Sequence, residues 1–201
     1  MCTNFFRFLG PWSLCIVILL GWSSAVAQSD RDALLGKAGL IIGFGIGGAV
    51  ASTTTKTTQF GVTMETSMTK AAVSGDFKLG AGLGERVLLY WFGKTAWYNG
   101  DDSFGVGTQT STIIALSGIG SSYWIARRIS FSAGLGVTSL TSNRETAYGP
   151  GFVIGAEYEF ARHWLIDFDV AFGKPDPDEL PGIDRETSSV VAKVTLNWLY
   201  Y

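Results

Sequence analysis

Apolar and polar residues alternate along most of the chain after residue 38, in segments of about ten residues or slightly more. Alternation with a period of two places successive side chains on opposite faces of a β-strand. A strand that crosses a bilayer at a tilt needs about 9–11 residues. The pattern predicts eight such strands, at residues 39–52, 70–83, 86–98, 109–125, 129–140, 149–160, 164–173 and 188–200.

The clearest face assignments come from the second half of the chain. In residues 164–173, one face carries Trp164, Ile166, Phe168, Val170 and Phe172, and the other carries Asp167 and Asp169. The fourth segment is ambiguous because Ile113 and Ile114 are adjacent, and a β-bulge would reconcile their faces. One face of each clear strand suits lipid, and the other is polar or small.

The connections between these segments alternate in length. Short turns are expected at 84–85, 126–128 and 161–163, and longer loops at 53–69, 99–108, 141–148 and 174–187. An up-and-down barrel with an even number of strands has short turns on the side of its termini and long loops on the other side. The first long loop is rich in threonine, and we expect it to extend its strand above the membrane.

Residues 1–27 have the features of a cleavable signal peptide. Arg7 precedes an apolar run over residues 14–20, shorter than the roughly 20 residues of a membrane-spanning helix. The triplet Ala25-Val26-Ala27 then fits a signal-peptidase site. A retained helical anchor is the alternative. We therefore expect a signal peptide at 1–27, a short periplasmic segment at 28–38 and a barrel domain at 39–201.

The carboxyl-terminal strand ends on aromatic residues. Its apolar face includes Val194, Leu196, Trp198 and Tyr200, and Tyr201 follows. This ending, the signal sequence and the alternating strands resemble the small bacterial outer-membrane β-barrel family, the OmpA/OmpX-like eight-stranded proteins. The resemblance implies an all-β, eight-stranded antiparallel up-and-down transmembrane β-barrel in the outer membrane of a Gram-negative cell, exported through the Sec pathway. It also implies an assembly signal in these four residues for the barrel assembly machinery, and contact with outer-membrane lipid and lipopolysaccharide.

Composition narrows the function classes. Only 16% of the residues are charged and the formal net charge is -2, so no basic excess favours nucleic acid. Cys2 and Cys15 both lie in the expected signal peptide, so we expect no disulfide or thiol chemistry in the mature chain. No apolar run after Ala27 is long enough for a membrane-spanning helix, and a membrane location therefore requires a closed barrel.

Projecting the strands onto a barrel collects most strand charges on its inner face. These residues are Asp76, Lys78, Lys94, Glu157, Glu159, Asp167, Asp169 and Lys193. Buried charges must pair or hydrogen-bond, so we expect a structural plug of ion pairs in the lumen. A hairpin centred on Arg162 sets Glu157 opposite Asp167, where either a cation such as Lys193 reaches both carboxylates or one of them keeps a proton.

Aromatic residues collect near the strand ends, as expected for rings at the two membrane interfaces. The predicted interface residues are Trp97, Trp124, Phe160, Trp164, Phe172, Trp198 and Tyr200.

Several motifs are weaker than they look. Residues 43–48 have the glycine spacing of a dinucleotide-binding loop but not its strand-turn-helix context, so Gly43, Gly45 and Gly47 are predicted as narrow lumen positions. His163 is the single histidine and lies in a predicted turn, which argues against the histidine-assisted lipid A enzymes found on small barrels and against a His/Cys metal site. The acidic loop at 174–184 lacks the spacing of a calcium loop. We expect no catalytic residue, metal or cofactor.

The leading hypothesis is a non-enzymatic integral barrel with a structural or surface-interaction role, through loop-mediated adhesion or envelope integrity, with an extracellular protein as a possible partner. A narrow pore for small solutes or ions is the alternative. A lipid-modifying enzyme and a soluble lipocalin-like binder are further alternatives.

Overall fold

The computed structural model describes residues 39–84, 86–100, 110–142, 145–176 and 183–201. The expected signal peptide and periplasmic segment fall on residues 1–38 and lie outside the described residues. The described part of the chain contains no helix with the length and apolar character of a membrane span.

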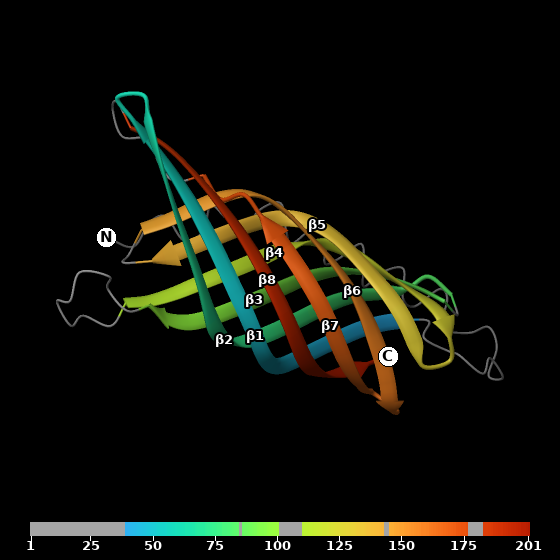
Figure 1. Ribbon diagram of the computed structural model, residues 1–201. Coiled ribbons are helices and arrows are strands. Elements are labelled where there is room, and N and C mark those ends of the chain that lie inside the picture. Colours follow the sequence, from blue (N-terminus) through green and yellow to red (C-terminus); the bar gives the residue numbers. More distant parts are fainter. Residues whose placement is uncertain (1–38, 85, 101–109, 143–144, 177–182) are drawn as a thin grey trace, which may run out of the picture.

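The strands form one closed barrel in which each strand is antiparallel to the next in the chain, and β1 also pairs with β8 (Figure 1). The eight strands are β1 Gly39–Gln59, β2 Val62–Gly82, β3 Val87–Gly100, β4 Thr110–Ala126, β5 Ile129–Ser142, β6 Glu145–Ala161, β7 Trp164–Gly173 and β8 Ile183–Tyr200. The predicted up-and-down barrel of eight strands is confirmed. The β2–β3, β4–β5 and β6–β7 turns and the carboxyl terminus share one end, called the turn end below, and the opposite end is the loop end.

The first hairpin is much longer than the sequence pattern predicts. β1 and β2 each have 21 residues, and a two-residue turn at Phe60 and Gly61 joins them. The long loop predicted at 53–69 is therefore wrong, because most of that segment continues both strands. Threonine favours strands, and its hydroxyls pair across this hairpin, with Thr58 Oγ1 3.0 Å from Thr63 Oγ1 and Thr54 Oγ1 3.2 Å from Ser67 Oγ.

The upper part of this hairpin and the start of β8 form a three-stranded sheet beyond the barrel wall. It consists of residues 53–59 of β1, 62–68 of β2 and 183–189 of β8, and we call it the projecting sheet. Figure 1 shows its tip standing well beyond the ends of β3 to β6. A strand that only crosses a bilayer needs about half the length of β1 or β2. The projecting sheet therefore lies outside the membrane at the loop end.

The outer face of the barrel is apolar. Large side chains such as Leu135, Ile46 and Ile119 are 73%, 67% and 66% exposed. A soluble protein rarely shows so continuous an apolar belt, and here it encircles a wall whose backbone groups are paired strand to strand. The belt suits lipid acyl chains.

The inner face holds two apolar layers as well as charges. The layer at the turn end consists of Ile41, Leu88, Tyr90, Phe92, Leu116, Trp124, Val153, Leu165 and Leu199. The layer toward the loop end consists of Ala49, Ala51, Ala96, Tyr98, Ile114 and Val191. These layers explain the ambiguous fourth strand. Ile113 points outward and Ile114 inward without a bulge between them, because the β4–β5 register is continuous until Trp124.

Glycines let β1 lie close against β8. Gly43, Gly45 and Gly47 are on the inner face of β1 and belong to a strand, not to a nucleotide-binding loop. A Cβ atom on Gly45 would lie 2.0 Å from Asn197 Oδ1, and one on Gly47 would lie 2.0 Å from the backbone oxygen of Val194. The close approach of β1 to β8 therefore requires glycine at these positions.

This geometry predicts that Gly47→Ala destabilises the barrel. The added methyl group would meet a backbone oxygen that cannot rotate away, and such overpacking costs about 1–3 kcal/mol. Gly48→Ala is the matched control, because a Cβ there has nothing within 4 Å. Urea unfolding in lipid vesicles, followed by tryptophan fluorescence, measures both variants. Equal losses of stability for the two would contradict the account of the β1–β8 seam.

Candidate functional site

The charged residues predicted to face the lumen all lie on the inner side of the barrel and are at most 9% exposed. They come from β2, β3, β6, β7 and β8, strands that lie on different sides of the ring. Seven of them, all but Glu159, form one layer across the lumen, which we call the charged layer. Alternation along each strand turns these residues inward, and barrel closure brings them together.

One part of the charged layer is built around Lys78 of β2. Its Nζ atom lies 2.8 Å from Glu157 Oε1 and 2.7 Å from Asp167 Oδ2. Glu157 and Asp167 face each other in the β6–β7 register, as the hairpin predicts. Glu157 also accepts hydrogen bonds from Ser130 Oγ at 2.8 Å and Ser122 Oγ at 3.0 Å. The lysine between the two carboxylates removes the repulsion that their register alone would cause.

The cation at this pair is Lys78 and not Lys193, which the sequence analysis named as a candidate. Lys78 lies on the far side of β1 from β8, and Gly43, its neighbour on β1, has no side chain in the way. The register of one hairpin cannot reveal a partner that reaches across the lumen.

The other part of the charged layer joins Lys94 and Lys193 to Asp76 and Asp169. Lys94 Nζ lies 2.6 Å from Asp169 Oδ2 and 3.3 Å from Asp76 Oδ2. Lys193 forms an ion pair with Asp76 and lies 3.9 Å from Asp169 Oδ2. Thr195 donates a 2.9 Å hydrogen bond to Asp76 Oδ2. Each carboxylate thus contacts two ammonium groups, which is the multiple pairing that buried charges require.

The charged layer lies between the two apolar layers of the lumen. On the turn side, Tyr90 packs near Lys78, whose Nζ is 5.5 Å from the ring centre, and the Tyr90 hydroxyl lies 2.9 Å from Ser122 Oγ. On the loop side, a cavity of about 20 Å³ is lined by Lys94 and Lys193 and by apolar residues that include Ile114. A volume of that size holds about one water molecule.

The charged layer also contains a cluster of carboxylates with the spacing of a metal site. One oxygen from each of Asp76, Asp167 and Asp169 lies within 4.8 Å of the others. All three carboxylates already contact lysine ammonium groups, which oppose a divalent cation. The cluster is therefore a centre of ion pairing. His163 lies in the β6–β7 turn, where its Nδ1 atom is 2.9 Å from the backbone oxygen of Leu199.

Glu159 lies apart from the charged layer, at the turn end. The hydroxyl of Tyr201 donates a hydrogen bond to Glu159 Oε1, and the Tyr201 ring packs against the apolar layer of the turn end. Burial and the Glu159 carboxylate raise the pKa of Tyr201 above its usual value. Tyr201 thus closes part of the lumen at the turn end.

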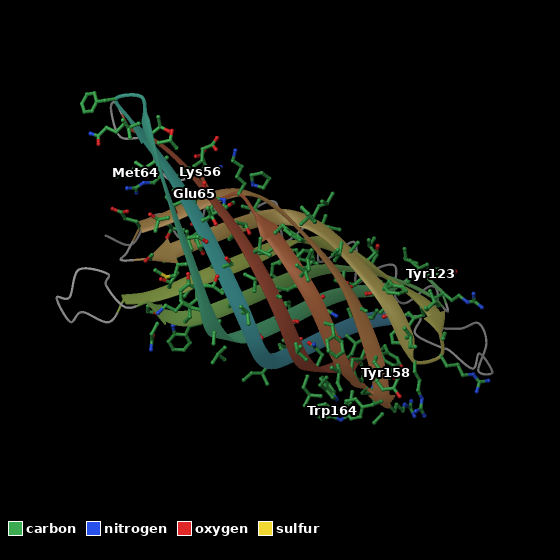
Figure 2. The ribbon with its side chains drawn as sticks, viewed as in Figure 1. Lys56, Met64, Glu65, Tyr123, Tyr158 and Trp164 are labelled. Carbon is green, nitrogen blue, oxygen red and sulfur yellow. The ribbon has the colours of Figure 1, made fainter. Side chains whose placement is uncertain are left out.

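The aromatic residues predicted at the membrane interfaces lie on the outer face with one exception. Trp97, Phe160, Trp164, Trp198 and Tyr200 are each 38–55% exposed, and Phe172 stacks on Phe152 with ring centres 4.7 Å apart. Figure 2 shows Tyr123, Tyr158 and Trp164 near the turn end. Trp124 is the exception, because it is 1% exposed and belongs to the apolar layer inside the barrel. Its position near the end of β4 suggested a membrane interface. Trp124 is two residues from Ser122, which faces inward, so both side chains lie on the inner face of the strand.

The contacts of Lys78 predict a large effect for Lys78→Met. This change keeps an apolar stem but leaves Glu157 and Asp167 buried, opposed and without their shared cation. Breaking a buried pair in this way costs roughly 3–5 kcal/mol. Lys56→Met is the control, because the side chains of Lys56 and its partner Glu65 are 52% and 58% exposed and such surface pairs contribute less than about 1 kcal/mol.

Adding Asp167→Asn to Lys78→Met is expected to recover part of the lost stability, since one of the two opposed charges is then gone. Urea unfolding of the single and double variants in lipid vesicles measures this. Additive losses would show that Lys78 does not act by screening Glu157 from Asp167.

Comparison with known proteins bears on the fold. No protein-family model matches the sequence, and no curated protein matches it. Among solved structures, the outer membrane protein OprG from Pseudomonas aeruginosa matches with a TM-score of 0.53 and 13% identity, over 85% of this chain and 100% of OprG.

Two further matches are weaker. Ail of Yersinia pestis matches with a TM-score of 0.42 and 8% identity, over 77% of this chain and 99% of Ail. Neisserial surface protein A matches with a TM-score of 0.46 and 8% identity, over 77% of this chain and 96% of that protein. Identities this low bear on the fold alone, and the OprG match agrees with the apolar belt, the closed ring and the strand order described above. The chain has the fold of an eight-stranded outer-membrane β-barrel.

Proposed function

We propose that this protein is a non-enzymatic barrel with a closed lumen, and that it contributes to the cell envelope through its outer surface and its projecting sheet. The observation that carries the proposal is the order of layers inside the barrel. A layer of mutually paired charges lies between two apolar layers. A barrel of eight strands has an interior that side chains can fill.

The cost of opening this interior supports a closed lumen. A hydrated ion entering the charged layer would have to replace contacts as short as 2.6–2.8 Å between lysines and carboxylates. It would also have to pass the turn-end layer, where Phe92 and Trp124 are 0% and 1% exposed. Removing a charge from water without full compensation costs several kcal/mol. These barriers lie in series along the barrel axis.

The placement of the titratable groups supports a non-enzymatic role. The buried carboxylates and lysines of the charged layer are engaged with one another, behind apolar layers on both sides. His163 lies at the turn end, where its ring contacts Tyr201 and the backbone of Leu199. General acid or base catalysis needs such a group within reach of a substrate.

The last strand supports the expected route of assembly. Val194, Leu196, Trp198 and Tyr200 face outward on β8, the strand that pairs with β1 to close the ring. We include in the proposal that the barrel assembly machinery reads this apolar row. The outward face then contacts outer-membrane lipid.

Single-channel recording in planar bilayers tests the closed lumen. We expect no steady conductance from the purified barrel, because its charges are paired and its apolar layers exclude water. Heat-dependent mobility on gels shows that the inserted protein is folded, and a large porin added to the same bilayer shows that the membrane reports open channels. Stable, ion-selective steps from the folded barrel would overturn the proposal.

A further inference from the structure

The projecting sheet has an open edge along β2. β2 pairs with β3 only from Val73, opposite Trp97, down to Gly82, opposite Leu88. Among the described residues, β1 is the only strand that pairs with β2 from residue 62 to residue 72. In Figure 1 the hairpin rises away from β3 along this length. Open edges carry backbone groups that are ready to pair with another chain.

The turn at the tip identifies which backbone groups point toward this edge. Phe60 and Gly61 have φ values of 51° and 78°, as in a two-residue type I′ turn. In such a hairpin the residues that flank the turn, Gln59 and Val62, form a hydrogen-bonded pair. Pairs then alternate, so the N–H and C=O groups of residues 63, 65, 67 and 69 point away from β1. Their four side chains are Thr, Glu, Ser and Thr.

Within the described residues, this edge has none of the usual protections against strand addition. Residues 62–72 contain no proline, and the β1–β2 register runs without a shift from Gly39 to Gln59. Natural edge strands are usually short, bulged, rich in lysine or interrupted by proline. This one is regular over more than ten residues, and the charged residues along it are Glu65 and Lys70.

A row of alternating charges crosses the projecting sheet and ends at this edge. Glu65 of β2 pairs in register with Lys56 of β1, and Lys56 with Glu186 of β8. Lys56 Nζ lies 3.7 Å from Glu65 Oε2, and Lys174 Nζ lies 3.3 Å from Glu186 Oε1. Figure 2 shows Lys56 and Glu65 on the projecting part of the hairpin. The row reads basic, acidic, basic, acidic toward the open edge, so a strand added there would continue it with a basic residue.

We propose that residues 63–69 of β2 bind an extended polypeptide segment of an extracellular protein by adding it as a further strand, with a lysine or arginine opposite Glu65. This deepens the proposed function and rests on it, since it names the partner class of the projecting sheet. Main-chain hydrogen bonds provide the affinity, and alternate side chains provide the choice of segment.

The two faces of the edge strand differ, and this restricts the segment further. Val62 and Met64 are on one face and are 63% and 71% exposed. Glu65, Ser67 and Thr69 are on the other face, because side chains alternate along the strand. A fitting segment therefore alternates apolar residues with polar or basic ones over about four to seven positions.

A peptide copied from β1 probes the main-chain pairing and the basic contact with Glu65, but not the apolar face of a fitting segment. Residues 51–59, Ala-Ser-Thr-Thr-Thr-Lys-Thr-Thr-Gln, already pair with β2 on its closed side with Lys56 opposite Glu65. Added to the labelled barrel in lipid nanodiscs, this peptide is expected to shift the amide NMR signals of residues 63, 65, 67 and 69. Ser67→Pro removes one N–H that points to the edge, at a position where an edge strand tolerates proline. It is expected to weaken binding about tenfold.

Ser67→Ala is the matched control, since it loses the same hydroxyl but keeps the N–H, and binding is expected to stay within about twofold. Glu65→Lys is expected to weaken the probe and to favour a peptide with glutamate in place of its lysine. Equal binding by the Pro and Ala variants would overturn the proposal, as would shifts confined to β1. Concentration-dependent shifts without peptide would also overturn it, in favour of a second copy at the edge.

The two experiments distinguish a failure of the closed-lumen proposal from a failure of the strand-addition proposal. A barrel that conducts ions but binds the probe at residues 63–69 contradicts the closed lumen and supports the edge. A silent barrel that does not bind the probe contradicts the edge alone.

Discussion

The pairing of β1 with β8 is the interaction on which the rest of the structure depends. In a bilayer core no water is available, so each backbone N–H and C=O group needs a partner in the protein, and β-strands provide one for every group only when they form a closed ring. The seam runs from Ile42, opposite Tyr200, to Gln59, opposite Ile183. It is also narrow, because Gly45 and Gly47 leave no room for a side chain between β1 and β8. Closure therefore determines both the diameter of the barrel and the crowding of its lumen.

A closed, narrow lumen determines how its charges must be arranged. Side chains that alternate inward from different strands are brought within a few ångströms of one another, too far from water to remain unpaired. Lys78, Lys94 and Lys193 each reach carboxylates on strands other than their own. The charged layer thus links opposite sides of the ring, and the apolar layers above and below it keep water from weakening those contacts.

Alternation along the chain predicts most of this arrangement, because a period of two assigns every residue of a strand to one face. It identifies the strands, the inward charges and the opposition of Glu157 and Asp167. It does not identify Lys78 as their partner, because that contact joins β2 to β6 and β7 across the lumen. The interface prediction for Trp124 is wrong because it relies on the position of this residue at a strand end and not on alternation. A large ring near a strand end suits either a membrane interface or an apolar layer of the lumen, and only the register of β4 decides between them.

The length of the first hairpin was predicted wrongly for a different reason. Threonine, serine and charged residues at positions 52–69 read as a loop because strands in lipid need one apolar face. Above the membrane that requirement ends, and both faces of a strand can be polar. Hydroxyl pairs such as Thr58 with Thr63 can then hold the hairpin together without a hydrophobic core.

The same change of solvent explains why an open edge can exist on β2 at all. Within the bilayer, unpaired groups at residues 63–69 would cost several kcal/mol each, and the ring would have to close over them. In water they are hydrated until a better partner arrives. Within the membrane β2 thus pairs with a strand on each side. Outside the membrane, β1 is the only strand of the described residues that pairs with it.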